Sequence, residues 1–145
     1  MIIEAIIIFI IIIAINFVLQ RLFPSNESWY NSINRSPLTP PNYIFPIAWT
    51  ILYLIISYSI SQSINSPLFY FWMFNIALNI MWTPIFFHYN NSVLSAVVIG
   101  LMIASLLYIL YNYYQTDKTL FYMNLLYLAW LCFAFYLNFY VAVSN

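Results

Sequence analysis

The run IIEAIIIFIIIIAINFVL, residues 2–19, decides the class of fold. It carries a single charged side chain, Glu4. At about 1.5 Å of rise per residue, a helix of this length matches the roughly 30 Å hydrocarbon core of a bilayer. Its leading end has no Lys or Arg and no small-residue cleavage site follows it, so we expect a retained transmembrane helix and not a signal peptide.

The rest of the chain has the same character. Of its 145 residues, 66% are hydrophobic and 4% are charged, against roughly 25% charged residues in an average soluble domain. The apolar runs do not alternate with polar residues, as the strands of a membrane barrel would. We predict an all-α, multi-pass integral membrane protein, a five-helix transmembrane bundle that forms a single domain over residues 1–145. The predicted helices cover residues 2–19, 44–63, 68–87, 93–112 and 120–143.

The few charged and reactive residues exclude several kinds of function. Three basic and three acidic residues give a net charge of zero without a basic patch, so we expect no nucleic-acid partner. No charged residue lies in the middle of a span, which argues against a proton relay or ion-coupled transport. Cys132 has no partner cysteine, His88 stands alone and Gly100 is the only glycine. We therefore expect no metal site, no phosphate-binding loop and no required cofactor.

One connection is far longer than the others. Residues 20–43 separate the first two predicted helices, whereas residues 64–67, 88–92 and 113–119 form short connections. A connection of about 24 residues exceeds the usual two to eight in helical bundles, and such loops are often lids or binding segments. Four apolar side chains, Trp29, Tyr30, Ile33 and Leu38, give this loop a surface with which to dock on the bundle.

Prolines mark the end of this loop. Pro40 and Pro41 favour an extended lead-in, while Pro46 suits a first helical turn, where its missing N–H is not needed. Because prolines also reduce the entropy lost on docking, we predict that they fix where Trp49 enters the bundle.

Polar and aromatic side chains spaced three or four residues apart share helix faces. These stripes are Asn75, Asn79, Trp82 and Phe86; Tyr127, Trp130, Ala134 and Asn138; and Trp49, Tyr53 and Ser57. One interpretation is that the amides make hydrogen bonds between helices. The other is that the stripes form a pocket wall on which Trp82 stacks a ligand, with space left by Ala134 beside Trp130. Four tyrosines near a helix end are interpreted as interfacial anchors, Tyr108, Tyr111, Tyr113 and Tyr114.

Three ordered motifs resemble those of a known family. They are WYNSINRSPLTPPNYIFPIAWTILY (residues 29–53), ALNIMWTPIFF (77–87) and YLAWLCFAFYLN (127–138). They are similar to the tryptophan-proline segment and to the third- and fifth-helix signatures of the translocator protein family (TSPO, also called TspO/MBR or the peripheral benzodiazepine receptor). Two positions depart from the family pattern: Leu126 replaces a proline, and Leu38 replaces an aromatic residue before the paired prolines.

The resemblance implies a five-helix bundle, commonly a homodimer, that binds hydrophobic ligands such as porphyrins, and sterols in some members. The motifs carry over Trp49, Asn79, Trp82, Trp130, Ala134, Leu137 and Asn138 as site residues. Some members resemble this chain closely enough to suggest light-dependent breakdown of porphyrin, for which Trp49 and Trp130 are the catalytic candidates.

Three functions remain open on this basis. The first is a membrane receptor or carrier in transport of porphyrin-like tetrapyrroles, with a pocket between the second, third and fifth predicted helices under the loop. Arg35 or Arg21 would then meet the carboxylates of the ligand. The second is an enzyme that oxidises the bound porphyrin, and the third is a structural or regulatory membrane protein. The predicted ligand-binding residues are Arg35, Trp49, Tyr53, Asn79, Trp82, Tyr127, Trp130, Ala134, Leu137 and Asn138.

Overall fold

The computed structural model describes residues 2–145. Within this range the chain is helical and has no strand. Its elements are α1 (Ile2–Leu22), α2 (Glu27–Ser32), α3 (Ile44–Ser63), α4 (Leu68–Thr83), the π-helix η1 (Pro84–His88), α5 (Ser92–Thr116) and α6 (Lys118–Ser144). Five stretches are long and apolar enough to cross a membrane, and α4 with η1 forms one of them. The predicted all-α bundle of five membrane-spanning helices is therefore confirmed.

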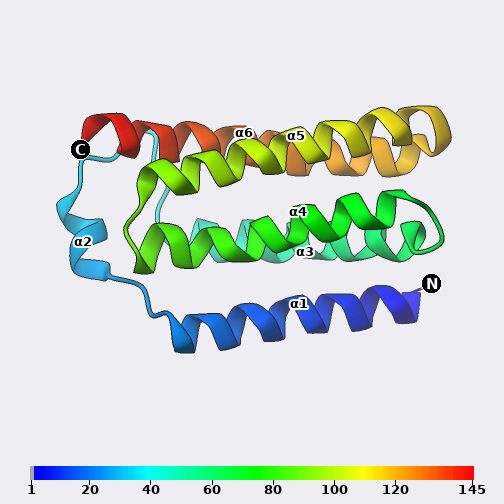
Figure 1. Cartoon of the computed structure of the whole chain (residues 1–145), viewed down its shortest axis with the longest axis horizontal. Helices are drawn as coiled ribbons and strands as arrows, with labels where there is room; N and C mark the ends of the chain where they lie inside the picture. Colours follow the sequence, from blue (N-terminus) through cyan, green and yellow to red (C-terminus); the bar gives the residue numbers. More distant parts are fainter. Residues whose placement is uncertain (1) are drawn as a thin grey trace.

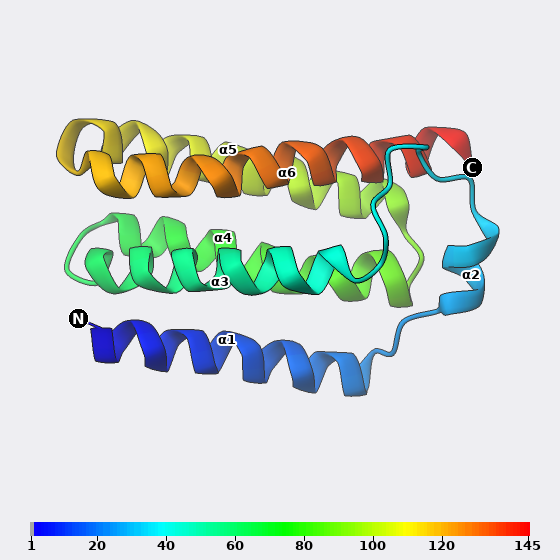
Figure 2. The ribbon, with the colours of Figure 1, turned by 180° about the vertical axis from the view of Figure 1, so that it is seen from behind.

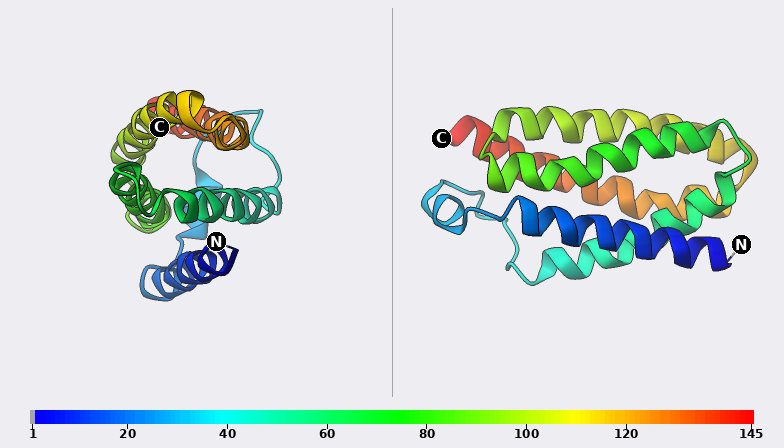
Figure 3. Two further views of the ribbon diagram at one scale, coloured as in Figure 1. Left: turned by 90° about the vertical axis from the view of Figure 1, so that its right-hand side faces the viewer. Right: turned by 60° about the horizontal axis from the view of Figure 1, so that its bottom comes forward.

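The five long helices lie side by side along one axis (Figure 1). Seen end-on, α3, α4, α5 and α6 form an arc, and α1 lies outside it against α3 (Figure 3, left). The short helix α2 crosses one end of the bundle, the end at which α6 finishes. Seen from behind, the rest of the loop runs along the end of α6 before it enters α3 (Figure 2). The loop thus covers one end of the bundle. At the other end, short connections join α3 to α4 and α5 to α6.

Helix α1 has little protein around it. Its one buried residue is Ile12, Ile8 is partly buried, and the other isoleucines of the helix are exposed. Since a bilayer offers no hydrogen-bonding partners, an apolar outer surface on a hydrogen-bonded helix suits contact with lipid. Contact with lipid therefore explains the long isoleucine run of α1. Only one stripe of this helix packs against the rest of the protein.

The prediction that residues 20–43 form a loop throughout is wrong in part. Helix α1 continues to Leu22, and α2 occupies Glu27–Ser32. The side chain of Asn26 caps α2 by accepting a hydrogen bond from the backbone N–H of Trp29 at 3.1 Å. Asn is among the strongest helix N-caps, so Asn26 followed by Glu27 was a usable signal for this short helix.

The predicted connection over residues 113–119 is also wrong. Helix α5 continues to Thr116 and α6 begins at Lys118. The single residue between them, Asp117, has extended backbone angles, and its carboxylate accepts a hydrogen bond from the N–H of Leu120 at 3.2 Å. An Asp at the N-cap begins a new helix at once, so no longer connection is needed.

Pro84 changes the end of the third membrane-spanning stretch. Proline has no N–H, so the helical hydrogen bond to the carbonyl of Ile80 is lost. The chain widens here into η1, in which the N–H of Tyr89 donates to the carbonyl of Pro84 at 3.0 Å. Asn90, with φ of 56°, and Asn91, whose side chain caps α5, then reverse the chain. This widened turn places Phe86 and Phe87 under the loop.

Candidate ligand-binding site

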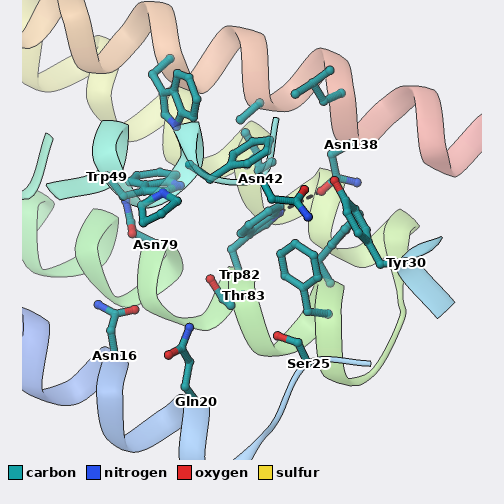
Figure 4. Close-up of a pocket in the computed structure, with 18 of the residues that line it drawn as sticks. Asn16, Gln20, Ser25, Tyr30, Asn42, Trp49, Asn79, Trp82, Thr83 and Asn138 are labelled. Atoms are coloured by element: carbon teal, nitrogen blue, oxygen red, sulfur yellow. Dashed lines mark hydrogen bonds between the residues drawn. The ribbon is translucent and has the colours of Figure 1, made fainter. Parts of the chain in front are cut away.

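A cavity of about 750 Å³ lies at the end of the bundle that the loop covers. Its walls come from α1, α3, α4 with η1, α5 and α6, and residues of the loop close its outer side. Figure 4 shows side chains from these elements converging on this space. A volume of this size falls within the range of small-molecule pockets, which are mostly apolar with a few placed polar groups.

The wall between α3 and α6 is aromatic. The ring of Trp49 stacks on that of Tyr53, with centroids 5.6 Å apart, and meets the ring of Trp130 edge-on at 6.2 Å. Phe45 lies against the other side of Trp130 at 5.9 Å. The indole Nε1 of Trp130 is buried and has no hydrogen-bond partner within residues 2–145. A buried donor without an acceptor is unfavourable, so hydrogen bonding does not hold this indole in place as it holds Trp82.

The wall formed by α4 and η1 carries the third tryptophan. Trp82 stacks on Phe86 at 5.2 Å with an angle of 14° between the ring planes. Its Nε1 donates to Oδ1 of Asn138 at 2.8 Å, and the amide nitrogen of Asn138 donates to the carbonyl of Ser92 at 2.8 Å. Contacts among α4, α6 and the first residue of α5 thereby fix the orientation of this indole, as a preformed stacking surface requires.

A hydrogen-bonded chain supports these rings from inside the bundle. The hydroxyl of Tyr53 donates to Oδ1 of Asn79 at 2.8 Å, and the amide of Asn79 donates to the hydroxyl of Tyr127 at 2.9 Å. Tyr127 in turn donates to Oδ1 of Asn75 at 2.6 Å, and Asn75 donates to Ser105 at 2.9 Å. The amides thus make hydrogen bonds between helices, as one of the two interpretations predicted, and Asn79 serves the cavity wall at the same time.

The loop brings two opposite charges to the cavity. Arg35 is half-buried, lines the cavity and holds its guanidinium carbon 4.4 Å from the centre of the Tyr30 ring. Glu27 lines the same space from α2. Arg21 does not line it and instead lies over the ring of Phe17 at 4.9 Å. Of the two arginines considered from the sequence, the structure brings only Arg35 to the cavity.

Direct contacts fasten the loop to the bundle. The ring of Trp29 meets that of Phe86 edge-on at 5.3 Å, and the hydroxyls of Ser36 and Tyr136 are 2.8 Å apart. Asn34 and Asn145 exchange hydrogen bonds of 2.9 and 3.0 Å. The predicted docking of the loop is confirmed for its aromatic residues Trp29 and Tyr30, which contact Phe86. Leu38 is 66% exposed, so its predicted docking is wrong.

The structure gathers almost the whole predicted set around one cavity. The lining includes Arg35, Trp49, Tyr53, Asn79, Trp82, Trp130, Ala134, Leu137 and Asn138. Tyr127 is the exception: it is fully buried behind Asn79 and does not line the space. Sequence reasoning missed the contribution of α1, whose lining residues are Ile13, Asn16, Phe17 and Gln20. Two polar residues four apart in an apolar helix were the signal for it.

The site offers stacking and hydrogen bonding. Within residues 2–145, no group of three or more His, Cys, Asp or Glu side chains is placed to hold a metal ion. The imidazole Nδ1 of His88 lies 2.9 Å from the carbonyl oxygen of Pro24, so this residue joins η1 to the chain after α1. Aromatic faces with a few placed hydrogen-bonding groups are the usual lining of a small-molecule pocket.

Fold and site together define a five-helix integral membrane protein with a tryptophan-walled cavity at one end. The loop of residues 23–43, between α1 and α3, covers this cavity and is called the lid below. The chain belongs to the TspO/MBR family, whose model matches residues 5–143. It is 32% identical to the tryptophan-rich protein TspO of Archaeoglobus fulgidus over 83% of this chain and 82% of that protein. It is 31% identical to protein CrtK of Rhodobacter capsulatus, over 79% and 77% of the two chains. A tryptophan-rich sensory protein of Cereibacter sphaeroides is 29% identical over 78% and 74%.

Proposed function

We propose that this protein is a membrane receptor or carrier that binds a porphyrin-like tetrapyrrole in the cavity beneath the lid. The observation that carries the proposal is the placing of Trp49, Trp82 and Trp130 on the walls of one space of about 750 Å³. Aromatic faces and edges are suited to a flat conjugated ring, and they come from three different helices.

An arginine of the lid favours a ligand that carries carboxylates. Arg35 lines the cavity, and its guanidinium is held over Tyr30. Arginine binds carboxylates through paired N–H groups, and a partly desolvated position strengthens such contacts. A ligand with its ring between the tryptophans and an acidic edge toward the lid would satisfy both parts of the site.

A second candidate function is light-dependent oxidation of the bound porphyrin by dissolved dioxygen. It is favoured by the edge-on pair of Trp49 and Trp130 at 6.2 Å, because both oxidisable rings border the cavity. The name of the Cereibacter sphaeroides relative, a sensory protein, favours the receptor for this chain.

Titration of the purified protein with protoporphyrin IX, in darkness and then under illumination, separates the candidates. We expect a saturable change in the porphyrin absorption band at one ligand per chain, and no loss of porphyrin in the dark. Accumulation of a new product only in the light, and only with intact Trp49 and Trp130, would favour the enzyme. A signal that rises linearly with ligand, as partition into detergent does, would contradict both.

A further inference from the structure

An open groove lies between the lid and the last turns of α6, next to the cavity. It has a volume of about 800 Å³, and α6 contributes Tyr140 and Ser144 to its lining. Four residues of the lid line both the groove and the cavity: Asn31, Arg35, Thr39 and Asn42. The lid is therefore a thin wall at this point, with the cavity on one side and the groove on the other, and all four shared residues are polar.

This wall leads from the aromatic interior to the surface of the protein. Asn31 and Asn42 are exposed, whereas Arg35 and Thr39 are half-buried. Figure 4 shows the side chain of Asn42 reaching from the lid toward the cavity. The groove thus lies at the end of the membrane-spanning helices, where water and lipid headgroups are found.

The four shared side chains are not used to hold the lid in place. Other residues fasten it to α6, among them Asn34, whose amide donates to the carbonyl of Ser144 at 3.2 Å. The guanidinium of Arg35 contacts the ring of Tyr30, but across residues 2–145 no hydrogen bond or ion pair joins any of the four side chains to another residue. Their donors and acceptors are therefore free for water or for a ligand.

Charge distinguishes the groove from the cavity. Arg35 is the one charged side chain that lines the groove within residues 2–145, whereas the cavity is also lined by Glu27. A carboxylate deep in the cavity would lie among apolar rings, and burial of an unpaired charge is costly. At the wall, the same carboxylate can bind the guanidinium of Arg35 and keep contact with water. The acid groups of a ligand are therefore best placed at the wall.

We infer that Asn31, Arg35, Thr39 and Asn42 form a polar port through the lid, in which the acid edge of the ligand lies while its ring stays between the tryptophans. The inference rests on the proposed function, since it assumes a tetrapyrrole in the cavity. It adds the class of tetrapyrrole that is selected, namely one whose acid groups gather on a single edge. Hydrophilic extensions of that edge are tolerated because they emerge in the groove.

Two isomers of one porphyrin test the selection of a single acid edge. Protoporphyrin IX carries its two propionates on neighbouring pyrroles, whereas a type isomer carries them on opposite sides of the ring, with the same composition and charge. Both are titrated by absorption in the same nonionic detergent. We expect the wild-type protein to bind protoporphyrin IX at least roughly tenfold more tightly, because the second propionate of the isomer cannot reach the port.

Two arginines provide a matched pair of variants. Arg35→Gln should reduce the ratio of the two affinities to about threefold or less, since the guanidinium at the port is lost. Arg21→Gln removes the same charge from a residue that lines neither the cavity nor the groove, so it should keep the wild-type ratio.

A longer ligand tests whether the acid edge emerges from the cavity. Protoporphyrin IX with both propionates converted to amides of a neutral glycol chain is compared with the dimethyl ester, so that charge plays no part. We expect both ligands to saturate with affinities within about threefold of each other, because the chains can lie in the groove. Asn42→Trp should narrow the port and weaken the glycol amide at least about fivefold relative to the ester. Leu38→Trp is the control, because Leu38 is exposed on the lid and lines neither space.

The outcomes separate the port from the proposed function. Equal affinities for the two isomers, a wild-type ratio in Arg35→Gln, equal effects of Asn42→Trp and Leu38→Trp, or a glycol amide that fails to saturate while the ester does would each overturn the port. Saturable binding of protoporphyrin IX would then still support the receptor. If no porphyrin of the set saturates the wild-type protein, the proposed function fails and the port fails with it.

Discussion

The two ends of the helical bundle use the same residue types in opposite ways. At the end away from the lid, Trp72 is fully buried, and its Nε1 donates to the hydroxyl of Tyr113 at 2.8 Å. That hydroxyl lies 2.6 Å from the hydroxyl of Ser63, so hydrogen bonds join side chains of α3, α4 and α5 at this end. At the lid end, Trp130 borders an open space and its N–H has no acceptor within residues 2–145.

The difference between the two ends lies in what fills the space between the helices. Interhelical packing and hydrogen bonds hold a bundle together in lipid, where burial of apolar surface gives little net gain. The end away from the lid has both, and it can hold the helices in position while the lid end stays open. Under the proposed function, a tryptophan at the end away from the lid is a packing residue, whereas a tryptophan at the lid end is a binding surface.

The largest expected effect is on stability, from a substitution at the end of the bundle away from the lid. Trp72→Ala removes a fully buried indole and leaves the hydroxyl of Tyr113 without its donor, so we expect a loss of about 3–5 kcal/mol in the free energy of unfolding. Thermal or denaturant unfolding in detergent measures it. The folded fraction should bind porphyrin as the wild type does; weakened binding with unchanged stability would place Trp72 at the site and not in the packing.

Two alanines give the next comparison. Ala134 lines the cavity, whereas Ala96 is buried in α5 outside it. Ala96→Leu should cost about 1–3 kcal/mol of stability through overpacking, while Ala134→Leu should leave the unfolding temperature nearly unchanged and weaken porphyrin binding at least about fivefold. Equal losses of stability in the two variants would show that Ala134 is packed and not part of an open site.

Trp49→Ala should have a smaller effect that falls on binding. The indole is half-buried and borders the cavity, so its removal enlarges a space that already exists. Loss of one aromatic contact worth about 0.5–1.5 kcal/mol predicts a roughly 2- to 12-fold higher Kd for porphyrin. Titration and unfolding are measured on the same preparation, and a loss of stability as large as that of Trp72→Ala would erase the distinction between the two ends.

The smallest expected effect concerns the lid. Ser36→Ala removes the hydroxyl contact to Tyr136 and the local hydrogen bond that Ser36 Oγ accepts from the N–H of Leu38, and it leaves the bonds between Asn34 and Asn145 in place. We expect porphyrin to dissociate about two- to threefold faster in stopped-flow displacement, in keeping with the modest net worth of one hydrogen bond. Ser32→Ala is the control, because Ser32 bonds only within α2 and its replacement should not change the rate.

Helix geometry explains why much of the site could be predicted from the sequence. The stripes that contain Trp49, Trp82 and Trp130 follow from the period of 3.6 residues, and the structure places all three on the cavity. The period does not say which helices are neighbours, so the face of α1 with Asn16 was missed. It also does not give the direction of a side chain within a wide face. Tyr127 was therefore expected on the cavity wall, whereas its hydroxyl points toward Asn79 and not into the cavity.

Helix ends were the other source of error. Tyr113 was assigned to the membrane interface because a connection was expected from residue 113 onward. Helix α5 instead continues to Thr116, which puts Tyr113 inside the bundle, where it is 3% exposed. The capping residues Asn26 and Asp117 explain the true helix starts, but a cap can be recognised only once the following turn is known to be helical.

The most direct test of the central claim, that the open lid end is the binding site, is a porphyrin titration of two variants. One replaces Trp49, Trp82 and Trp130 together by Phe, and the other replaces Trp72 by Phe. We expect the triple variant to lose most of its affinity for protoporphyrin IX and to unfold somewhat earlier, because Trp82→Phe removes the hydrogen bond to Asn138. We expect Trp72→Phe to unfold earlier as well but to keep its affinity. Wild-type affinity in a well-folded triple variant would contradict the account and place the porphyrin elsewhere on the protein.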